Sequence, residues 1–356
     1  MTPPRARRSH DALRVVSTVK RYDDLLVLEC EHRGDRAVAK LCRDGDRERR
    51  EQLLNELASY QRLQSPGCPY VLRLLRAVGA RNFAWSPPPQ PPEAVFGLLL
   101  ERARGRSLRR FLEVAAARPD LYDAYELLAV LLQVTAAVAY LHAAGVVHND
   151  LHHGNVFVCL ESRNGAFSGD AELRNHRVDA GGGFVYGFQS RYRALVYDFD
   201  WSSRVPPDAQ SLDDGDVCRT SGQCGRNRVA LTDEYHLWAP LADSPHPEVA
   251  DAARYFVPAP ALLANAGRAR WHTLCFPQQP KDGPLSRETC ARCQPRTPAE
   301  VRRAEDALRD PHGPFARFLP GGDDYHGGDF YHYDVRLPQR EHVSAALVDR
   351  ELPPCA

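Results

Sequence analysis

The sequence predicts an α+β protein of two lobes, in which a smaller lobe built on a sheet precedes a larger, mainly helical lobe. Three observations support this fold class. The chain has 356 residues, which is long enough for two hydrophobic cores. Its first third contains five short apolar runs typical of strands and one helical segment. Beyond residue 104, apolar residues recur mostly at helical spacing.

Residues 12–103 are assigned to the N-terminal lobe, with one helix inserted after the third of five strands. The helix is expected at 46–63, where Leu53, Leu57 and Tyr60 recur at positions i, i+4 and i+7. The five strand-like runs are 12–19, 25–30, 36–42, 70–78 and 94–103.

Residues 104–270 are assigned to the helical lobe. Ser107 is a candidate N-cap for one helix, and the apolar run 122–145 predicts a second, longer one. The stretch 161–192 is polar and rich in glycine, so it is interpreted as a surface insertion. A flexible loop is favoured there, with a substrate-docking element as the alternative. Residues 271–356 form a C-terminal extension to which the sequence assigns no role.

The composition is that of an ordinary soluble protein, with 43% hydrophobic residues, 26% charged residues and a formal net charge of zero. A balanced charge gives no reason to expect nucleic acid or a membrane as a partner. Residues 1–11 are basic and rich in proline, so we expect a disordered arm and no secretory signal. A cytoplasmic protein with reduced thiols is therefore expected. Only three residues are lysine, which makes Lys40, inside an apolar strand, stand out.

The C-terminal extension contains two pairs of residues spaced as zinc ligands often are. His272 and Cys275 are separated by two residues, as are Cys290 and Cys293. Together these four side chains could hold Zn²⁺ in a tetrahedral site. The first pair is mixed and the sequence between the pairs is short and rich in proline, so free thiols are the preferred interpretation.

Two short segments carry the residues with the clearest chemistry. VVHNDLHHGN, which ends at Asn155, leads from a predicted helix into a strand and contains Asp150. VYDFDWS ends a second strand and contains Asp198. If these strands pair as a hairpin, Asn155 and Asp198 converge as oxygen ligands suited to Mg²⁺. Asp150 would remain available to accept a hydroxyl proton, although a simple turn-forming role is the alternative.

These segments resemble motifs of the protein-kinase-like superfamily. His148, Asp150 and Asn155 are spaced as in the catalytic loop of that family, and residues 198–200, Asp-Phe-Asp, resemble its metal-binding D-F-G motif. We expect His148 to be a packed structural residue that supports the loop, and not an acid or base.

Further segments resemble the same family in the same order along the chain. AVAKL resembles its third-strand motif, which implies that Lys40, fixed by Glu56 of the next helix, holds the α- and β-phosphates of ATP. The alternatives are a Lys40 that reaches solvent and a Glu56 that pairs with a surface arginine. LLLERARGRSLRRFL resembles the interlobe hinge and places Glu101 at the nucleotide. In LTDEYHLWAPL, Asp233 is expected to support the backbone of the catalytic loop.

The resemblance covers roughly residues 12–240. It implies a bilobal protein-kinase-like fold whose N-terminal sheet is five-stranded and antiparallel. It also implies an ATP-dependent phosphotransferase in which Asn155 and Asp198 hold Mg²⁺ and Asp150 is the catalytic base for γ-phosphoryl transfer to a hydroxyl. Ser or Thr of a protein is the preferred acceptor.

Several positions depart from the family pattern. No glycine occurs in 17–24, where the family has a glycine-rich phosphate loop. Asp200 replaces the glycine of D-F-G, and we expect it to cap the next turn or, alternatively, to add a carboxylate near the metal. Asn149 replaces an arginine, and His152 stands where protein-serine kinases usually have lysine. HNDLHHGN is similar to the loops of aminoglycoside- and choline-type kinases, so a small-molecule kinase and a pseudokinase scaffold are the alternatives.

Overall fold

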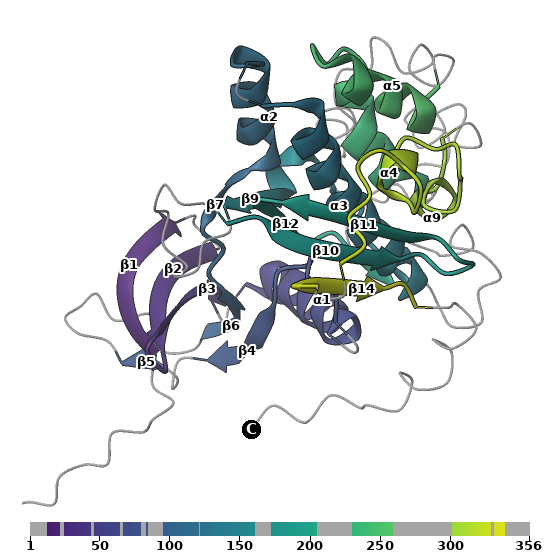
Figure 1. Ribbon diagram of the computed structural model, residues 1–356. Coiled ribbons are helices and arrows are strands. Elements are labelled where there is room, and N and C mark those ends of the chain that lie inside the picture. The colour runs from purple at the N-terminus through teal and green to yellow at the C-terminus, as the bar shows by residue number, and fades with distance from the viewer. Residues whose placement is uncertain are drawn as a thin grey trace, which may run out of the picture.

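The computed structural model of the chain has an N-terminal lobe built on a sheet beside a larger C-terminal lobe (Figure 1). The α+β class and the five-stranded antiparallel sheet with one helix are confirmed. The predicted arm, residues 1–11, lies outside the described residues. The structure describes residues 13–21, 25–43, 46–64, 67–79, 83–84, 95–120, 122–160, 172–204, 230–258, 301–328 and 331–338.

The N-terminal sheet has the strand order β4-β6-β3-β2-β1-β5. Its five longer strands pair antiparallel, and a short β5 (Phe83–Ala84), which was not expected, pairs parallel to β1. Lys40 lies within β3, between Val27 of β2 and Leu98 of β6. The longer strands are β1 (Leu13–Arg21), β2 (Leu25–His32), β3 (Asp35–Arg43), β4 (Leu74–Gly79) and β6 (Val95–Glu101).

Helix α1 (Arg47–Leu63) lies between the sheet and the C-terminal lobe (Figure 1). Its N-cap, Asp46, accepts a hydrogen bond from the backbone N–H of Arg49 at 3.0 Å. The buried face follows the expected helical period, with Leu53, Leu57, Tyr60 and Leu63 in the core. Glu56 lies on this face and is fully buried, so its carboxylate requires a cationic or hydrogen-bonding partner.

The C-terminal lobe begins with β7 (Gly105–Ser107) and α2 (Leu108–Ala117), and Ser107 caps α2 as expected by accepting from the N–H of Arg110 at 3.2 Å. Helix α3 (Ala124–Ala143) is the centre of this lobe, and every residue from Leu127 to its end is buried. By length and composition α3 could cross a membrane, but 83% of its most apolar window is buried within the fold.

The segments that contain Asp150 and Asp198 lie at one end of a small three-stranded sheet of order β12-β9-β7. Strand β9 (Val156–Leu160) pairs antiparallel with β12 (Tyr192–Val196), as the sequence predicted. A short η2 helix (His153–Asn155) leads into β9, and β8 (Val146–Val147) pairs with β13 (Ser203–Arg204) beside it. This pairing brings the residues that follow β12 next to those that precede β9.

Much of the predicted insertion, 161–192, is ordered, which differs from the flexible loop that the sequence favoured. Strands β10 (Arg174–Asp179) and β11 (Val185–Ser190) form an antiparallel hairpin, whose turn contains three glycines with positive φ. His176 stacks on Phe188 with 4.9 Å between ring centroids, and both rings are fully buried. The physical reason is that alternate residues of each strand enter the core, a pattern that the glycine-rich composition obscured.

The C-terminal part of the chain packs into the same lobe. Trp238 stacks on Phe256 at 4.3 Å, and the hydroxyl of Tyr186 donates to the carbonyl of Leu308 at 2.8 Å. Strand β14 pairs parallel with β10, so it extends the hairpin to three strands. The four candidate zinc ligands lie outside the described residues. The elements of this part are α4 (Ala230–Trp238), η4 (Ala239–Leu241), α5 (Pro247–Phe256), α9 (Ala304–Ala307), η6 (Ala316–Phe318) and β14 (Tyr333–Arg336).

Candidate active site

Lys40 is the centre of the candidate site. Its ammonium Nζ donates to Glu56 Oε2 at 2.9 Å, which is the pairing expected from the sequence, and to Asp198 Oδ1 at 2.6 Å. A third carboxylate oxygen, Asp200 Oδ1, lies 2.5 Å from the same nitrogen. The Lys40 side chain is 10% exposed, so the interpretation of a lysine that reaches solvent is excluded. Strand β3, helix α1 and the end of β12 thus meet at one ammonium group.

The electrostatics of this cluster keep Lys40 charged. Burial by itself lowers the pKa of Lys40, but Glu56, Asp198 and Asp200 outweigh it and raise this pKa well above its usual value. For the Asp200 carboxyl, burial acts in the opposite direction and raises the pKa. The positive charges of Lys40 and Arg49 outweigh burial, so the pKa of Asp200 is lowered. Glu56 is the most deeply buried of the three acids, and burial raises its pKa well above the usual range. Three carboxylates therefore share one buried ammonium.

Asp200 has a different role from the turn cap that we favoured. Besides its contact with Lys40, its second oxygen, Oδ2, accepts from Arg49 at 3.0 Å. Arg49, near the polar start of α1, was not a candidate site residue in the sequence. Arg49 is seven residues before Glu56, and residues seven apart lie two turns along the same helix face. This spacing could have predicted that Arg49 lies on the side of α1 that faces the site. The Asp200 carboxylate is therefore held between Lys40 of β3 and Arg49 of α1.

Phe199 fixes the backbone of the Asp-Phe-Asp segment. Its fully buried ring lies 4.9 Å, between centroids, from Tyr60 of α1 and also from the ring of His148. Its N–H donates to Glu56 Oε1 at 3.3 Å. Asp198 has a φ of 69°, in the left-handed region that few non-glycine residues adopt. The packing of Phe199 on both sides holds the neighbouring carboxylates towards Lys40.

The catalytic-loop backbone is supported by Asp233, as the sequence predicted. The two carboxylate oxygens of Asp233 accept from the N–H of His148 at 2.9 Å and of Asn149 at 2.8 Å, and His142 Nε2 lies 3.0 Å from Oδ2. Asn149 has a φ of 62° and its side chain donates to the carbonyl of Trp201 at 3.0 Å. The residue that replaces the family arginine thus ties the catalytic loop to the segment that follows Asp200.

Asp150 and Asn155 face each other across the loop. Asn155 Nδ2 donates to the carbonyl of Asp150 at 2.9 Å and to its Oδ2 at 3.1 Å. The N–H of Tyr197 donates to the carbonyl of Asn155 at 3.1 Å, which places Asp198 directly beside this pair. His148 is fully buried, and its Nε2 lies 2.9 Å from the carbonyl of Tyr197. This agrees with the packed structural residue that we expected.

The oxygen atoms of Asn155 and Asp198 fit the predicted magnesium site. Because Asn155 uses its Nδ2 on Asp150, its Oδ1 is the atom left for a metal, and Asp198 keeps 35% of its side chain exposed. Carboxylate and amide oxygens are the ligands that Mg²⁺ prefers. Carboxylate oxygens of Glu56, Asp198 and Asp200 also lie within 4.8 Å of one another, but the cation at their centre is Lys40.

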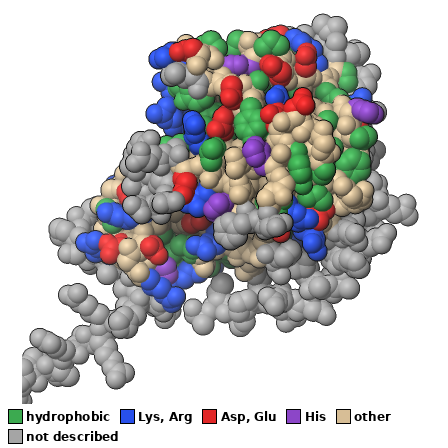
Figure 2. Space-filling view, in the orientation of Figure 1, with side chains coloured by type: hydrophobic (Ala, Val, Ile, Leu, Met, Phe, Trp, Pro, Cys, Tyr) green, Lys and Arg blue, Asp and Glu red, His purple; other side chains and the backbone are tan. Residues whose placement is uncertain are grey.

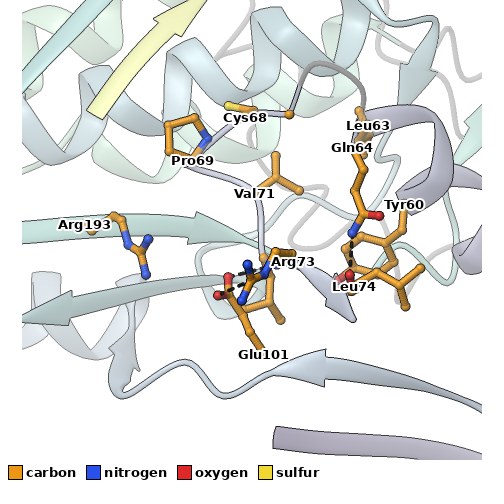
Figure 3. Close-up of a pocket in the computed structure, with 12 residues that line it drawn as sticks. Tyr60, Leu63, Gln64, Cys68, Pro69, Val71, Arg73, Leu74, Glu101 and Arg193 are labelled. Atoms are coloured by element: carbon orange, nitrogen blue, oxygen red, sulfur yellow. Dashed lines mark hydrogen bonds and ion pairs between the residues drawn. The ribbon is translucent and has the colours of Figure 1, made fainter. Parts of the chain in front are cut away.

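Glu101, the expected hinge residue, directs its carboxylate towards Arg73 (Figure 3). Its Oε1 accepts from the N–H of Arg73 at 2.9 Å, and its own N–H donates to the carbonyl of Arg73 at 2.9 Å. These residues line a cavity of about 610 Å³ between α1, β4 and β12, which does not include Lys40. The carboxylate of Glu101 therefore holds the backbone and side chain of Arg73 at the wall of this cavity.

The glycine-free segment 17–24 takes part in the sheet up to residue 21. Strand β1 departs from regular pairing at two places, between Val15 and Ser17 and between Thr18 and Lys20. Val16 and Val19 are 39% and 54% exposed. Residues 17–21 of this segment therefore continue a strand with irregular pairing, and they include no glycine.

Comparison with known proteins finds one family. Residues 26–166 match the family model of the protein kinase domain. This match, over residues 26–166, places that domain of the chain in the protein kinase superfamily. The matched part of this kinase runs from β2 into the residues that follow β9, and so includes Lys40, Glu56, Asp150 and Asn155. No curated protein matches the chain significantly. A protein kinase domain indicates phosphotransferase chemistry that uses ATP and Mg²⁺.

Proposed function

We propose that this kinase transfers the γ-phosphoryl group of ATP to the hydroxyl of Ser or Thr in a protein. The observation that carries the proposal is the pair of contacts from Lys40, at 2.9 Å to Glu56 and at 2.6 Å to Asp198. A lysine held by a helix carboxylate, next to a half-buried carboxylate suited to a metal, is the arrangement that phosphoryl transfer uses.

Each residue of the site has a defined part in this reaction. Lys40 binds the α- and β-phosphates and Glu56 orients it. Asn155 and Asp198 hold Mg²⁺, which supplies positive charge to the phosphates. Asp150, whose side chain is 16% exposed, orients the acceptor hydroxyl and takes its proton. The acceptor oxygen bonds to the γ-phosphorus as the bond to the bridging β,γ-oxygen breaks, and ADP leaves.

The test is transfer of ³²P from labelled ATP to mixed protein substrates. Asp150→Asn should lower the rate by about 10²–10⁴-fold, because the amide cannot accept the proton, while Mg·ATP binding is unchanged. Glu113→Gln, at an exposed position of α2, is the matched control and should keep full activity. Equal transfer by the wild type and Asp150→Asn would contradict the proposal.

A small-molecule acceptor is tested in the same assay with sugars, aminoglycosides and choline. The feature that favours it is His152 beside Asp150, where protein-serine kinases usually carry lysine. Transfer to one of these compounds but to no protein would replace Ser/Thr by a metabolite hydroxyl and leave the site assignments intact.

A pseudokinase scaffold is the remaining candidate, and two observations favour it. The segment 17–24 contains no glycine, and Asp200 already binds Lys40. A scaffold that cannot use ATP would show no rise in melting temperature with Mg·ATP and no transfer to any acceptor. Stabilisation by Mg·ATP that is lost in Lys40→Met would argue against it.

A further inference from the structure

His152 lies beside the proposed base. Its Nε2 is 3.9 Å from Asp150 Oδ2, and its side chain is 37% exposed. Its Nδ1 accepts from the N–H of Gly154 at 2.9 Å. Because Nδ1 accepts, the ring proton of the neutral imidazole is on Nε2, which makes Nε2 a hydrogen-bond donor on the side of Asp150. The ring is therefore fixed as a donor next to the position of the acceptor hydroxyl.

Arg109 extends this donor surface away from Asp150. A Cβ placed on Gly154 would lie 2.6 Å from Cε1 of His152 and 3.8 Å from Nη2 of Arg109. The imidazole and the guanidinium thus converge over the same glycine, where helix α2 packs against η2. Gly154 provides the space in which the two side chains approach each other.

Part of the positive charge of this edge has no ion-pair partner among the residues that the structure describes. Arg102 pairs with Glu29 and Arg110 pairs with Glu113. Arg106 and Arg109 are both exposed, and neither forms an ion pair with any residue that the structure describes. Figure 2 shows Lys and Arg side chains gathered along the edge of the upper lobe where α2 lies in Figure 1.

The helix dipole does not favour an arginine at this position. The first turn of α2 contains no acidic residue, and a cation there opposes the positive end of the helix dipole. Arg109 gains no ion pair within the described part of the chain to offset this cost. A negatively charged group supplied from outside would complete the surface.

We propose that the acceptor of this kinase is an acidic peptide segment, in which Asp or Glu within about three residues of the acceptor Ser or Thr binds Arg109 beside His152. The proposal rests on the proposed function, since it names the substrate class of the same site. Arg109 would set specificity and take no part in the phosphoryl transfer step. Arg106 would add to the positive field of the same edge.

The test compares three peptides of equal length with one Ser, flanked by Asp, Ala or Lys. The full-length wild type should phosphorylate the Asp peptide with a KM about tenfold below that of the Ala peptide, as expected for a charge-assisted hydrogen bond. Arg109→Gln should remove that difference and leave kcat and the KM for ATP unchanged. Arg110→Gln, in the same turn but paired with Glu113, is the matched control and should keep the preference.

Binding of the same peptides, labelled with a fluorophore, separates this proposal from the proposed function. If no peptide is phosphorylated but the Asp peptide binds and Arg109→Gln weakens it about tenfold, the acidic surface is supported and the transfer reaction is not. Equal KM values or equal binding for the Asp and Ala peptides would overturn the proposal. Retention of the preference in Arg109→Gln, or transfer to an acidic metabolite by a protein that binds none of the peptides, would also overturn it.

Discussion

The ammonium Nζ of Lys40 lies 2.5 Å from Oδ1 of Asp200, a residue 160 positions later in the chain. A lysine ammonium has three N–H donors, and the oxygens of Glu56, Asp198 and Asp200 provide one acceptor for each. All three donors are therefore used before any nucleotide arrives. A phosphate that binds Lys40 must therefore displace one of these carboxylates. The glycine that the family has at the position of Asp200 has no carboxylate, so it would not compete with a phosphate in this way.

Replacing Asp200 by alanine should strengthen Mg·ATP binding. The change releases one donor of Lys40 and removes a negative charge near the phosphates, so we expect the Kd to fall by about 3–10-fold. Isothermal titration with a non-hydrolysable ATP analogue measures the effect. Arg49→Ala, which leaves Asp200 on Lys40, is the control and should show no such gain. A tenfold weaker affinity in Asp200→Ala would instead make Asp200 a ligand of the metal.

Lys40→Met should destabilise the fold as well as abolish nucleotide binding. The methionine leaves three carboxylates without their shared ammonium, and loss of one partner of a buried ion pair costs about 3–5 kcal/mol. Urea unfolding measures this loss. The double variant Lys40→Met with Glu56→Met should recover part of it, because it also removes the most deeply buried acid. No recovery in the double variant would mean that packing, and not charge, dominates at this position.

Asp233→Asn should loosen the catalytic loop. The amide keeps one acceptor oxygen for the N–H groups of His148 and Asn149, and each buried donor that loses its partner costs about 1–3 kcal/mol. Unfolding free energy and transfer rate should fall together, because the same loop carries Asp150. Asp251→Asn, which removes an exposed ion pair with Arg254, should change neither. A normal rate in Asp233→Asn would contradict the role of this carboxylate.

Stability should depend on pH through Glu234, the neighbour of Asp233. Burial raises the pKa of Glu234 to about 7 from its usual 4.5, so the folded state holds this proton more tightly than the unfolded state. The stabilising contribution is complete below pH 4.5, falls as the pH rises to 7 and is absent above it. At about 1.4 kcal/mol per pH unit, the loss is about 3 kcal/mol.

The variant Glu234→Gln checks the sign of this effect. The amide does not titrate, so its unfolding free energy should lack the decline between pH 4.5 and 7. The difference between the two proteins, measured by urea unfolding across this range, should move in favour of the variant as the pH rises. Parallel curves would mean that Glu234 titrates alike in both states.

The local part of this site was predictable from the sequence, and the reason is periodicity. Lys40 lies in an apolar strand and Glu56 on the apolar face of a helix, so the spacing of the apolar residues alone directs both side chains inward. The support of the catalytic loop by Asp233 came from the family resemblance. Asp200 was misjudged because its partners, Lys40 and Arg49, are distant in sequence, and no local pattern reports such a contact.

The hairpin of β10 and β11 was missed for a related reason. Its composition, rich in glycine and polar residues, is that of a surface loop, and it lies outside the family motifs. Its strands are held by contacts with residues that are distant in the sequence. The ring of His176 stacks on that of Phe188 and is tilted against that of Tyr333, with 4.9 Å between centroids in each case. Its Nδ1 is 2.9 Å from the hydroxyl of Tyr70. These partners come from three separate regions of the chain, so the core that they build exists only in the folded protein.

The parallel addition of β14 to β10 determines how far this chain can be shortened. Val335 is 1% exposed, and the N–H of Leu337 donates to the carbonyl of Asp179 at 3.0 Å. A fragment cut before Tyr333 would leave β10 as an open edge, with unpaired backbone groups that invite a strand from another molecule. The boundary at which a kinase domain is recognisable in the sequence is thus not the boundary at which the chain can fold without aggregating.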